Sequence, residues 1–334
     1  MKALIKTKVK DEFRIEERNI PILNDNELLV QVEYCGVCGS DLHAAAHAKG
    51  YEFVPKPIIL GHEISGTVIK VGNNVNKSLK NSRIIIKPAT HCGKCEQCEK
   101  GYYNICSNIL GLGLHYDGGM AEYIKVSSNQ IIVIPDELPF DVAALVEPLS
   151  VAIHAVERIN DPIENKNILV QGCGIIGIFT AIVAKLQKAD VTISGLKRDW
   201  EHRLRYAEEI GIKTEIFEER MGTNDQFDFI FECSGSSIAT EKAINRLKKG
   251  AEIILVALYE NYVQFPINVL VRSEINVISS YSSNEEDFYK SIKILMDNVR
   301  KFNKLIKKYP LIDGVEAFED AKNLRVLKPL LKLK

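Results

Sequence analysis

The chain lacks an excess of charge of either sign. Its 334 residues include 43 Lys and Arg against 44 Asp and Glu, which gives a formal net charge of −1. Nucleic-acid-binding domains usually carry a basic excess, so this balance argues against nucleic acid as a partner. The apolar fraction of 46% and the charged fraction of 26% are near the globular average, which excludes a disordered or fibrous chain.

The sequence also lacks a long hydrophobic run. The longest uncharged stretch covers 167–184, 18 residues, which only just reaches the length of a membrane-spanning helix. Three glycines interrupt it, and we therefore expect no membrane segment. Lysines break up the first ten residues, so no signal-peptide core forms there. These absences predict a soluble, cytoplasmic protein.

A chain of this length exceeds one hydrophobic core, since single cores stop growing at about 250–300 residues. Up to residue 150, short β-branched runs between Gly, Pro and Asn predict an irregular, mostly β domain. The predicted strands there are 28–32, 66–71, 83–87 and 130–134.

Beyond residue 150, strands and helices alternate. Strands are predicted at 167–171, 190–194, 227–233, 252–257 and 275–279, and helices at 178–186, 201–210 and 238–247. This rhythm indicates an α/β domain with a doubly wound parallel sheet. From about residue 284 the pattern becomes a charged amphipathic helix and a Leu-rich end, which we expect to pack back on the first domain.

Eight cysteines are present, and four of them crowd into a segment at 91–107. They follow the spacing C-x2-C-x2-C-x7-C and are Cys92, Cys95, Cys98 and Cys106. Four thiolates so close can surround one tetrahedral Zn²⁺, and because no position stays open such a zinc is structural. An iron–sulfur cluster is the alternative, but the long x7 gap and the absence of Pro after the fourth cysteine disfavour it.

A second set of metal-binding residue types is scattered along the chain. It comprises the run Cys38–His43, the tripeptide 61–63 with His62 and Glu63, and Glu147 in Glu-Pro-Leu-Ser. A thiolate, an imidazole and a carboxylate suit Zn²⁺, and three ligands with an open position are typical of catalytic sites. Because these residues are far apart in sequence, spacing alone leaves scattered surface polar residues as an equal alternative.

A glycine-rich turn follows the strand predicted at 167–171 and opens a helix. It reads Gly172-Cys-Gly174-Ile175-Ile176-Gly177. In a strand–turn–helix context this pattern is a dinucleotide fingerprint, with the pyrophosphate on the helix N-terminus. A glycine-rich turn that binds nothing is the alternative.

The end of the second strand discriminates between cofactors. An NAD enzyme carries Asp or Glu there, to accept a hydrogen bond from the ribose 2′-hydroxyl. This chain has Gly195, followed by Lys197 and Arg198. The missing carboxylate and the two cations favour NADP over NAD; the alternative is an ordinary solvated turn.

The order of these motifs resembles the zinc-containing medium-chain alcohol dehydrogenase family over almost the whole chain. The matching segments are Cys38–His43, 61–63, the lobe 91–107, Asp117–Tyr123 and Glu147-Pro-Leu-Ser-Val. The last resembles the sorbitol, threonine and sugar dehydrogenase branch. The resemblance implies a GroES-like catalytic domain of 1–153 and 285–334 and a Rossmann domain of 154–284. It also implies a polyol or sugar substrate and a homotetramer or dimer.

The resemblance further implies roles for individual residues. Cys38, His62 and Glu63 would hold a catalytic zinc, in addition to the structural one. Glu147 would sit beside that zinc, as a ligand or one water away, and Asp41 would hydrogen-bond the far nitrogen of His62.

The remaining roles concern the proton and the substrate. Ser40 would take the substrate hydroxyl proton and pass it through the cofactor ribose to His43. Cys35 falls on no ligand position and is interpreted as a small buried hydrophobe, while His115 and Tyr116 are candidates for the substrate pocket. Two alternatives remain: a zinc-independent quinone or carbonyl reductase of the same fold, and a non-enzymatic protein whose zinc lobe binds a partner.

Overall fold

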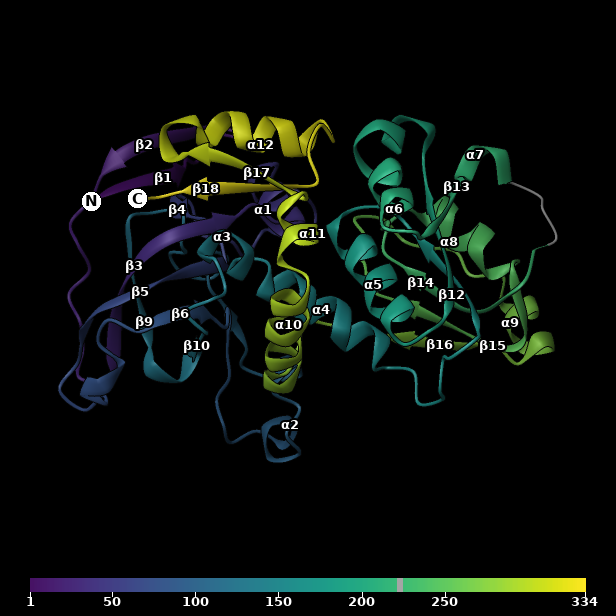
Figure 1. Cartoon of the computed structure of the whole chain (residues 1–334), viewed down its shortest axis with the longest axis horizontal. Helices are drawn as coiled ribbons and strands as arrows, with labels where there is room; N and C mark the ends of the chain where they lie inside the picture. The colour runs from purple at the N-terminus through teal and green to yellow at the C-terminus, as the bar shows by residue number, and fades with distance from the viewer. Residues whose placement is uncertain (221–224) are drawn as a thin grey trace. The chain divides into compact units, whose positions relative to one another are not determined.

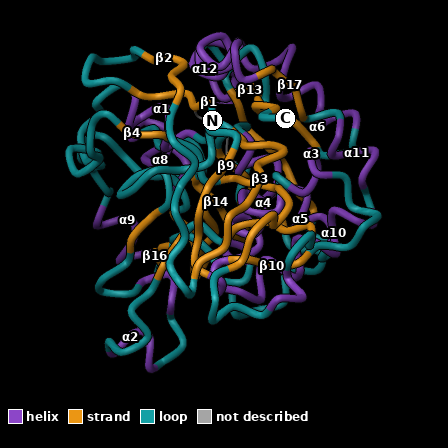
Figure 2. The backbone as a smooth tube through the Cα atoms, turned by 90° about the vertical axis from the view of Figure 1, so that its left-hand side faces the viewer, coloured by secondary structure: helices purple, strands orange, loops and turns teal. Residues whose placement is uncertain are grey.

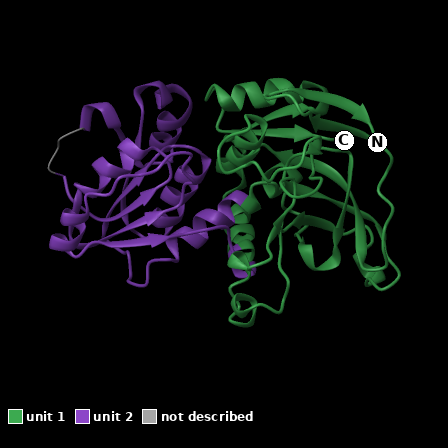
Figure 3. Ribbon diagram, turned by 180° about the vertical axis from the view of Figure 1, so that it is seen from behind, with its two compact units in different colours: residues 1–147, 288–334 green, residues 148–287 purple. Residues whose placement is uncertain are grey.

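The computed structural model describes residues 1–220 and 225–334, which divide into two compact units. Unit 1 consists of Met1–Glu147 and Phe288–Lys334, and unit 2 is Pro148–Asp287 (Figure 3). Both boundaries fall inside helices, α4 (Val146–Val156) and α10 (Glu285–Asp297).

Unit 2 is built on a six-stranded parallel sheet in the order β13-β12-β11-β14-β15-β16 (Figure 1). This is the strand order of a Rossmann fold, so the predicted α/β class with a doubly wound sheet is confirmed. The strands are β11 Asn167–Gln171, β12 Asp190–Gly195, β13 Lys213–Ile216, β14 Phe227–Glu232, β15 Leu247–Leu255 and β16 Asn276–Ser279. The helices are α5 Ile175–Leu186, α6 Arg205–Glu209, α7 Phe217–Arg220, α8 Ser237–Ile244 and α9 Ile267–Ser273.

Two local predictions for unit 2 need correction, and three short elements were not predicted. The helix predicted at 201–210 begins as a π-helix, Trp200–Leu204, before α6. The helix predicted at 238–247 ends at Ile244, because Leu247 already pairs with Phe227 in the sheet and is buried there. The short strand β13 and the helices α7 and α9 were not predicted.

Unit 1 is mostly β, and β3 (Glu27–Gly36) is its centre, paired with β5, β9 and β18 (Figure 1). Figure 2 shows β3 beside β9. The other strands of this sheet are β5 Glu63–Val71, β6 Arg83–Ile86, β9 Tyr123–Ser127, β10 Ile131–Val133, β17 Ile306–Pro310 and β18 Lys328–Lys332. The C-terminal segment therefore contributes two strands to a sheet that begins near the N-terminus.

Two smaller sheets and several short helices complete unit 1. The strands are β1 Lys2–Lys6, β2 Phe13–Glu17 and β4 Ile58–Ile59 in one sheet, and β7 Ala89–Thr90 and β8 Leu110–Gly111 in the other. The helices are α1 Gly39–Ala45, α2 Glu96–Glu99, α3 Phe140–Ala143, α11 Val299–Asn303 and α12 Gly314–Lys322. Among the described residues, no helix has the length and apolarity that crossing a membrane requires.

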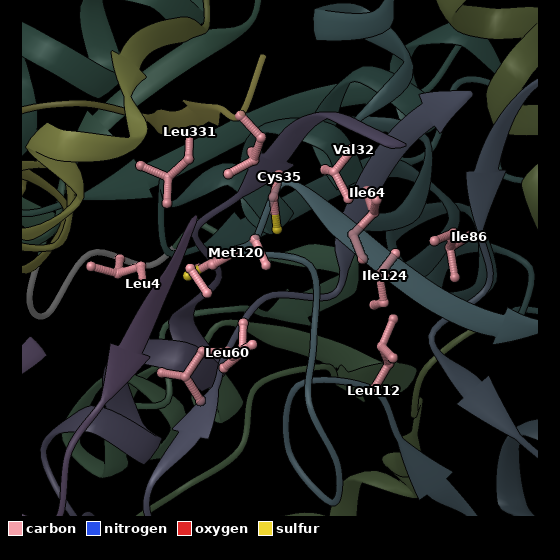
Figure 4. Close-up of a cluster of buried hydrophobic side chains, with 14 of the residues drawn as sticks. Leu4, Val32, Cys35, Leu60, Ile64, Ile86, Leu112, Met120, Ile124 and Leu331 are labelled. Atoms are coloured by element: carbon pink, nitrogen blue, oxygen red, sulfur yellow. The ribbon is translucent and has the colours of Figure 1, made fainter. Parts of the chain in front are cut away.

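The core of unit 1 gathers side chains from both sequence segments. Leu4, Ile64 and Leu331 meet in one cluster of buried hydrophobic residues (Figure 4). Cys35 is fully buried in the same cluster, as predicted for a cysteine that acts as a small hydrophobe. The cluster packs under the end of β3 and the start of β5, which fixes the backbone from which the candidate metal ligands project.

Candidate active site and metal centres

Cys38, His62 and Glu63 come together in unit 1, with one ligand atom of each within 4.8 Å of the others. Cys38 is the N-cap residue of α1, and Glu63 opens β5 directly opposite Gly36 on β3. Cys38 follows β3 by two residues, so the pairing of β3 with β5 brings it close to His62 and Glu63. Sequence spacing alone had left scattered surface residues as an equal alternative, and the geometry disfavours it.

Asp41 is fully buried behind this cluster and fixes its backbone. Its Oδ2 accepts the N–H of Cys38 at 2.9 Å, and its Oδ1 accepts the N–H of Gly61 at 3.2 Å. The distance from Oδ1 to Nδ1 of His62 is 3.6 Å, longer than a hydrogen bond. Asp41 thus holds the chain on either side of the site rather than bonding the ring directly.

The electrostatics of the cluster suit a dication. Burial, the largest single influence on His62, would lower its pKa, but the charges of Asp41 and Cys38 reverse this and raise the pKa well above its usual range. The Nδ1 atom of His62 is buried without a hydrogen-bond partner. A soft thiolate, an imidazole and a carboxylate in a site this rich in negative charge fit Zn²⁺.

Lys328 is a site residue that the sequence did not reveal. It is fully buried on β18, and its Nζ donates to both oxygens of Glu63 at 2.6 and 2.5 Å and to the carbonyl of Val37 at 3.1 Å. Burial would lower the pKa of Lys328, but the charge of Glu63 raises it, so the ammonium remains charged. No local pattern links residues 265 positions apart, so only the fold brings this pair together.

Glu147 is buried at the start of α4. Burial raises its pKa to about 7; the charge of Glu63 acts in the same direction, and that of His62 opposes it. This electrostatic coupling indicates that Glu147 belongs to the same charged neighbourhood. Its carboxylate is not one of the three groups that cluster within 4.8 Å.

The two residues assigned to proton transfer lie on α1. The Oγ of Ser40 is 3.4 Å from Nε2 of His62, at the edge of the cluster. Ser40 and His43 are three residues apart on a helix and therefore share a face. Both are partly exposed, which a proton path to solvent requires.

A row of stacked rings extends from His43. Ring centroids are 5.4 Å apart for His43 and Tyr51, 6.1 Å for Tyr51 and Phe53, and 4.7 Å for Phe53 and His115. The Nδ1 of His115 accepts the N–H of Gly111 at 3.0 Å, which leaves its Nε2 to carry the proton. Of the two predicted pocket residues, His115 thus belongs to this row.

Tyr116 has a different environment. It is partly buried, and its hydroxyl group lies 3.2 Å from Nε2 of Gln130. That contact engages the polar end of Tyr116 and makes His115 the stronger substrate-pocket candidate of the pair.

The four-cysteine lobe brings its sulfurs to metal-binding spacing. The Sγ of Cys95 is 3.5 Å from that of Cys98 and 3.8 Å from that of Cys106, and Cys106 is 3.6 Å from Cys92. Sulfurs bound tetrahedrally at about 2.3 Å from one zinc stand about 3.8 Å apart. Backbone donors at Cys98 and Ser107 lower the pKa of Cys95 to about 5, which favours the thiolate that a metal binds. The lobe therefore fits a closed zinc site.

The dinucleotide fingerprint of unit 2 has the predicted local structure. The turn at 172–174 joins β11 to α5, and Gly174 is the N-cap residue without a side-chain cap bond. The first-turn N–H groups of Ile175, Ile176 and Gly177 thus lack a capping side chain, the arrangement that binds a pyrophosphate.

The basic turn at the end of β12 is a 3₁₀-helix, Lys197–Asp199, with exposed Lys197 and Arg198 side chains. Two carboxylates accept hydrogen bonds from its backbone N–H groups, and the sequence did not predict these contacts. Asp199 accepts the N–H of Leu196 at 3.0 Å, and Glu218 accepts the N–H of Lys197 at 3.2 and 3.4 Å. The turn therefore carries both signs of charge.

A Rossmann sheet with a glycine fingerprint, a β unit with a three-residue metal cluster, and a closed four-thiol lobe together define a zinc-binding dehydrogenase. Residues 24–136 match the family described as "Alcohol dehydrogenase GroES-like domain", and residues 176–297 match "Zinc-binding dehydrogenase".

Relatives of known name agree over the full length. The chain is 30% identical to D-arabitol-phosphate dehydrogenase of Enterococcus avium, covering 96% of this chain and 94% of the relative. It is 31% identical to a sorbitol dehydrogenase of Halalkalibacterium halodurans, covering 99% of each. The chain therefore belongs to the zinc-containing medium-chain alcohol dehydrogenase family. It is an oxidoreductase that acts on a CH–OH group by hydride transfer with a nicotinamide cofactor.

Solved structures of similar chains contain both forms of that cofactor. A zinc-binding dehydrogenase of Sinorhizobium meliloti bound to NADP has a TM-score of 0.89 and 25% identity, covering 99% of this chain and 98% of that one. An alcohol dehydrogenase of Escherichia coli complexed with NADH has a TM-score of 0.90 and 26% identity, covering 99% of each chain. The family thus uses NAD(P), and the choice between the two forms depends on the individual chain.

Proposed function

We propose that this protein interconverts a secondary alcohol of a polyol or sugar with the corresponding ketone. The observation that carries the proposal is the convergence of Cys38, His62 and Glu63, with the Ser40 hydroxyl 3.4 Å from the imidazole. The substrate class is supported by relatives named for arabitol phosphate and sorbitol.

The chain would bind two zinc ions. Cys38, His62 and Glu63 would hold the catalytic one, with Glu147 nearby to complete its surroundings, and the four-cysteine lobe would hold a structural one. The catalytic zinc, when bound, supplies Lewis acidity to the alcohol oxygen. Lys328 holds the Glu63 carboxylate in place and compensates part of its negative charge. The bound zinc would then not have to neutralise that charge alone.

The protein side chains move the proton. Ser40 Oγ would accept the proton of the substrate hydroxyl, and His43 would release it to solvent, with the cofactor ribose between them. A positioned relay of this kind contributes about 10²–10⁴-fold to the rate. The row of rings from His43 to His115 would border the substrate and exclude water on that side.

For the cofactor we propose a preference for NADP over NAD. Support comes from Gly195, which offers no carboxylate to the ribose, and from the exposed cations Lys197 and Arg198. Glu218 opposes this preference, because its carboxylate accepts the Lys197 N–H at 3.2 Å and repels a phosphate. The balance of these charges would set the selectivity.

We further propose a homo-oligomer, a dimer or tetramer, in a cytoplasmic setting. Helix α9 has no buried residue, and its Ile267 and Val271 are 61% and 69% exposed. It lies next in sequence to β16, an edge strand of the six-stranded sheet. Exposed apolar side chains and an unpaired edge strand of this kind favour contact with a second copy of the chain. The cytoplasmic setting is supported by the four-cysteine lobe, because its thiols can bind a metal only while they are not oxidised, and the cytoplasm keeps thiols reduced.

One experiment tests the core of the proposal. Metal analysis of the purified protein should give two zincs per chain, and a spectrophotometric screen of polyols, sugars and their phosphates with both cofactors should give turnover. The Ser40→Ala variant should lose turnover while retaining both zincs. Full activity after removal of all metal would reject the zinc-dependent mechanism.

A further inference from the structure

Three loops of unit 2 pack backbone to backbone at the carboxyl ends of β11, β14 and β15. Gly172 has φ of +105°, and a Cβ there would lie 2.7 Å from the nitrogen of Ser234. Gly235 has φ of +68°, and its Cβ would lie 2.9 Å from the carbonyl oxygen of Leu258. Because no side chain separates these loops, the loops after β14 and β15 rest directly on each other and on the fingerprint turn.

Glu232 lies at the centre of this arrangement and is fully buried. Its Oε1 accepts the N–H of Ser234 at 2.9 Å and the hydroxyl of the same residue, and its Oε2 accepts the N–H of Gly235 at 3.2 Å. Within 1–220 and 225–334 no Lys or Arg side chain forms an ion pair with Glu232. A buried carboxylate without a cation depends entirely on such donors, and each of them is correspondingly important.

Tyr259, in the loop after β15, supplies the remaining donor. Its hydroxyl donates to Oε2 of Glu232 at 2.5 Å and lies 2.8 Å from Oγ1 of Thr240 on α8. A carboxylate only accepts, so the phenol proton points to Glu232. The single proton of the Thr240 hydroxyl has two acceptors within reach, the phenol oxygen and the carbonyl oxygen of Ser236 at 2.9 Å. Burial and then the charge of Glu232 raise the pKa of Tyr259, which keeps the donor protonated.

The position of the Tyr259–Glu232 hydrogen bond in the sheet assigns it to one half of the cofactor. A Rossmann sheet consists of two mononucleotide-binding halves, and the adenosine ribose contacts the end of the second strand, here β12. The loops after β14 and β15 belong to the other half, on the far side of the fingerprint turn. They therefore border the nicotinamide nucleotide.

We propose that Tyr259, acting through Glu232, is a positioning residue for the nicotinamide half of the cofactor. The phenol locks the loops after β14 and β15 against the fingerprint turn, so that this half of the site is formed before the cofactor arrives. Preorganisation of this kind lowers the cost of ordering loops on binding. The inference rests on the proposed cofactor chemistry.

The test measures the binding of whole and half cofactors to the full-length protein, without turnover. NADPH and NADH probe both halves of the site, and ADP probes the adenosine half alone. For Tyr259→Phe we expect dissociation constants for the dinucleotides to rise about tenfold or more, as for loss of a hydrogen bond to a charged group. ADP binding should stay within about twofold of the wild type, since its contacts lie at β12 and the fingerprint.

Tyr262→Phe is the matched control, since it removes a hydroxyl from the same loop at a residue that is 92% exposed. It should leave all three constants unchanged. If Tyr259→Phe does not fold, Thr240→Val removes the hydroxyl that contacts the phenol oxygen at 2.8 Å and should weaken dinucleotide binding selectively, by about threefold.

Unchanged dinucleotide binding in Tyr259→Phe would overturn the inference. Equal weakening of ADP and dinucleotides would also overturn it, because the phenol would then stabilise the whole unit and not one half of the site. A wild-type protein that binds none of the three nucleotides would reject the proposed cofactor itself.

Discussion

Lys328 and Glu63 form a buried ion pair, and breaking such a pair leaves an uncompensated charge. The cost of removing one partner is about 3–5 kcal/mol. We therefore expect Lys328→Met, which retains most of the side-chain volume, to lower the free energy of unfolding by about that amount. Denaturant titration followed by circular dichroism, with zinc content measured in parallel, provides the comparison.

Lys332→Met is the matched control for this substitution. Lys332 lies on the same strand, β18, but is exposed, so its replacement should cost less than about 0.5 kcal/mol. Glu63→Gln combined with Lys328→Met should recover much of the lost stability, since no buried charge is then left alone. A Lys328→Met protein as stable as the wild type would show that Glu63 is compensated by other groups.

Asp320 provides a pH-dependent contribution within unit 1. It accepts from Lys307 at 2.7 Å and from the hydroxyl of Tyr309 at 2.5 Å, and the hydrogen bond from Lys307 is the largest cause that lowers its pKa to about 2. The folded pKa lies below the unfolded value of about 3.9. Its stabilisation is therefore present above about pH 4 and disappears as the pH falls through 2.

Asp320→Asn should accordingly be less stable than the wild type at pH 7, and the difference should shrink as the pH falls from 4 to 2. Unfolding free energies at several pH values measure this. Asp297→Asn, at an exposed residue of α10, should show no such trend. A difference that stays constant from pH 7 to pH 2 would contradict the role of the carboxylate charge.

Among the structural elements, the cysteine lobe and helix α1 make opposite predictions for the loss of one thiol. A closed four-thiolate site contributes its metal-binding energy to folding. Cys95→Ser should thus lose one zinc and lower the melting temperature. Cys38→Ser should also lose one zinc, but it should abolish turnover with little change in melting temperature.

Metal content, thermal unfolding and activity separate the two cases. Cys233→Ser is the control for metal content alone, at a cysteine outside both metal clusters. Turnover retained by Cys38→Ser with a single zinc would reject the assignment of the catalytic site, and an unaltered melting temperature in Cys95→Ser would reject a structural role for the lobe.

The 3₁₀ turn after β12 predicts how cofactor choice responds to charge. Replacing Lys197 and Arg198 by Ala should raise the KM for NADP at least about tenfold, since each charge-assisted bond contributes about 1.5–3 kcal/mol before screening. The KM for NAD should change little. Glu218→Gln removes the opposing carboxylate and should lower the KM for NADP.

High salt should reduce both changes in the KM for NADP, the rise in the Lys197 and Arg198 variant and the fall in Glu218→Gln, because these side chains are exposed to solvent. Steady-state kinetics with both cofactors at low and high ionic strength make the measurement. Variants that treat NAD and NADP as the wild type does would show that this turn is an ordinary solvated one.

How far sequence alone predicts this molecule depends on the sequence range of the interactions. The fingerprint and the four-cysteine array are local patterns, and their strand–turn–helix and thiol-cluster structures were predicted. Leu247 was assigned to a helix because its place in the sheet depends on Phe227, twenty residues earlier. Lys328 and Tyr259 gave no signal, because their partners are distant in sequence or lie in another loop. The carboxylate of Glu218 likewise reaches the basic turn only through β13, a strand too short to show a pattern.

On the scale of the whole molecule, the two units differ in chain continuity. Unit 2 is one segment, 148–287, whereas unit 1 needs both 1–147 and 288–334. Strand β18 pairs with β3 on one side and β17 on the other (Figure 1). A chain truncated after Asp287 should therefore keep a protease-resistant unit 2 and an exposed, cleavable 1–147. Limited proteolysis with mass spectrometry tests this, and equal resistance of both parts would contradict it.

The same discontinuity determines the order in which the two units are completed during translation. Glu63 and Lys328 are 265 residues apart, and at about 5–20 residues per second the ribosome needs roughly a quarter of a minute to a minute to travel between them. Throughout that interval the nascent chain carries Cys38, His62 and Glu63 without the ammonium group that compensates them, while all of unit 2 is translated. The nucleotide-binding unit is thus complete first, and the candidate metal site of Cys38, His62 and Glu63 reaches its final form only when strand β18 has been made.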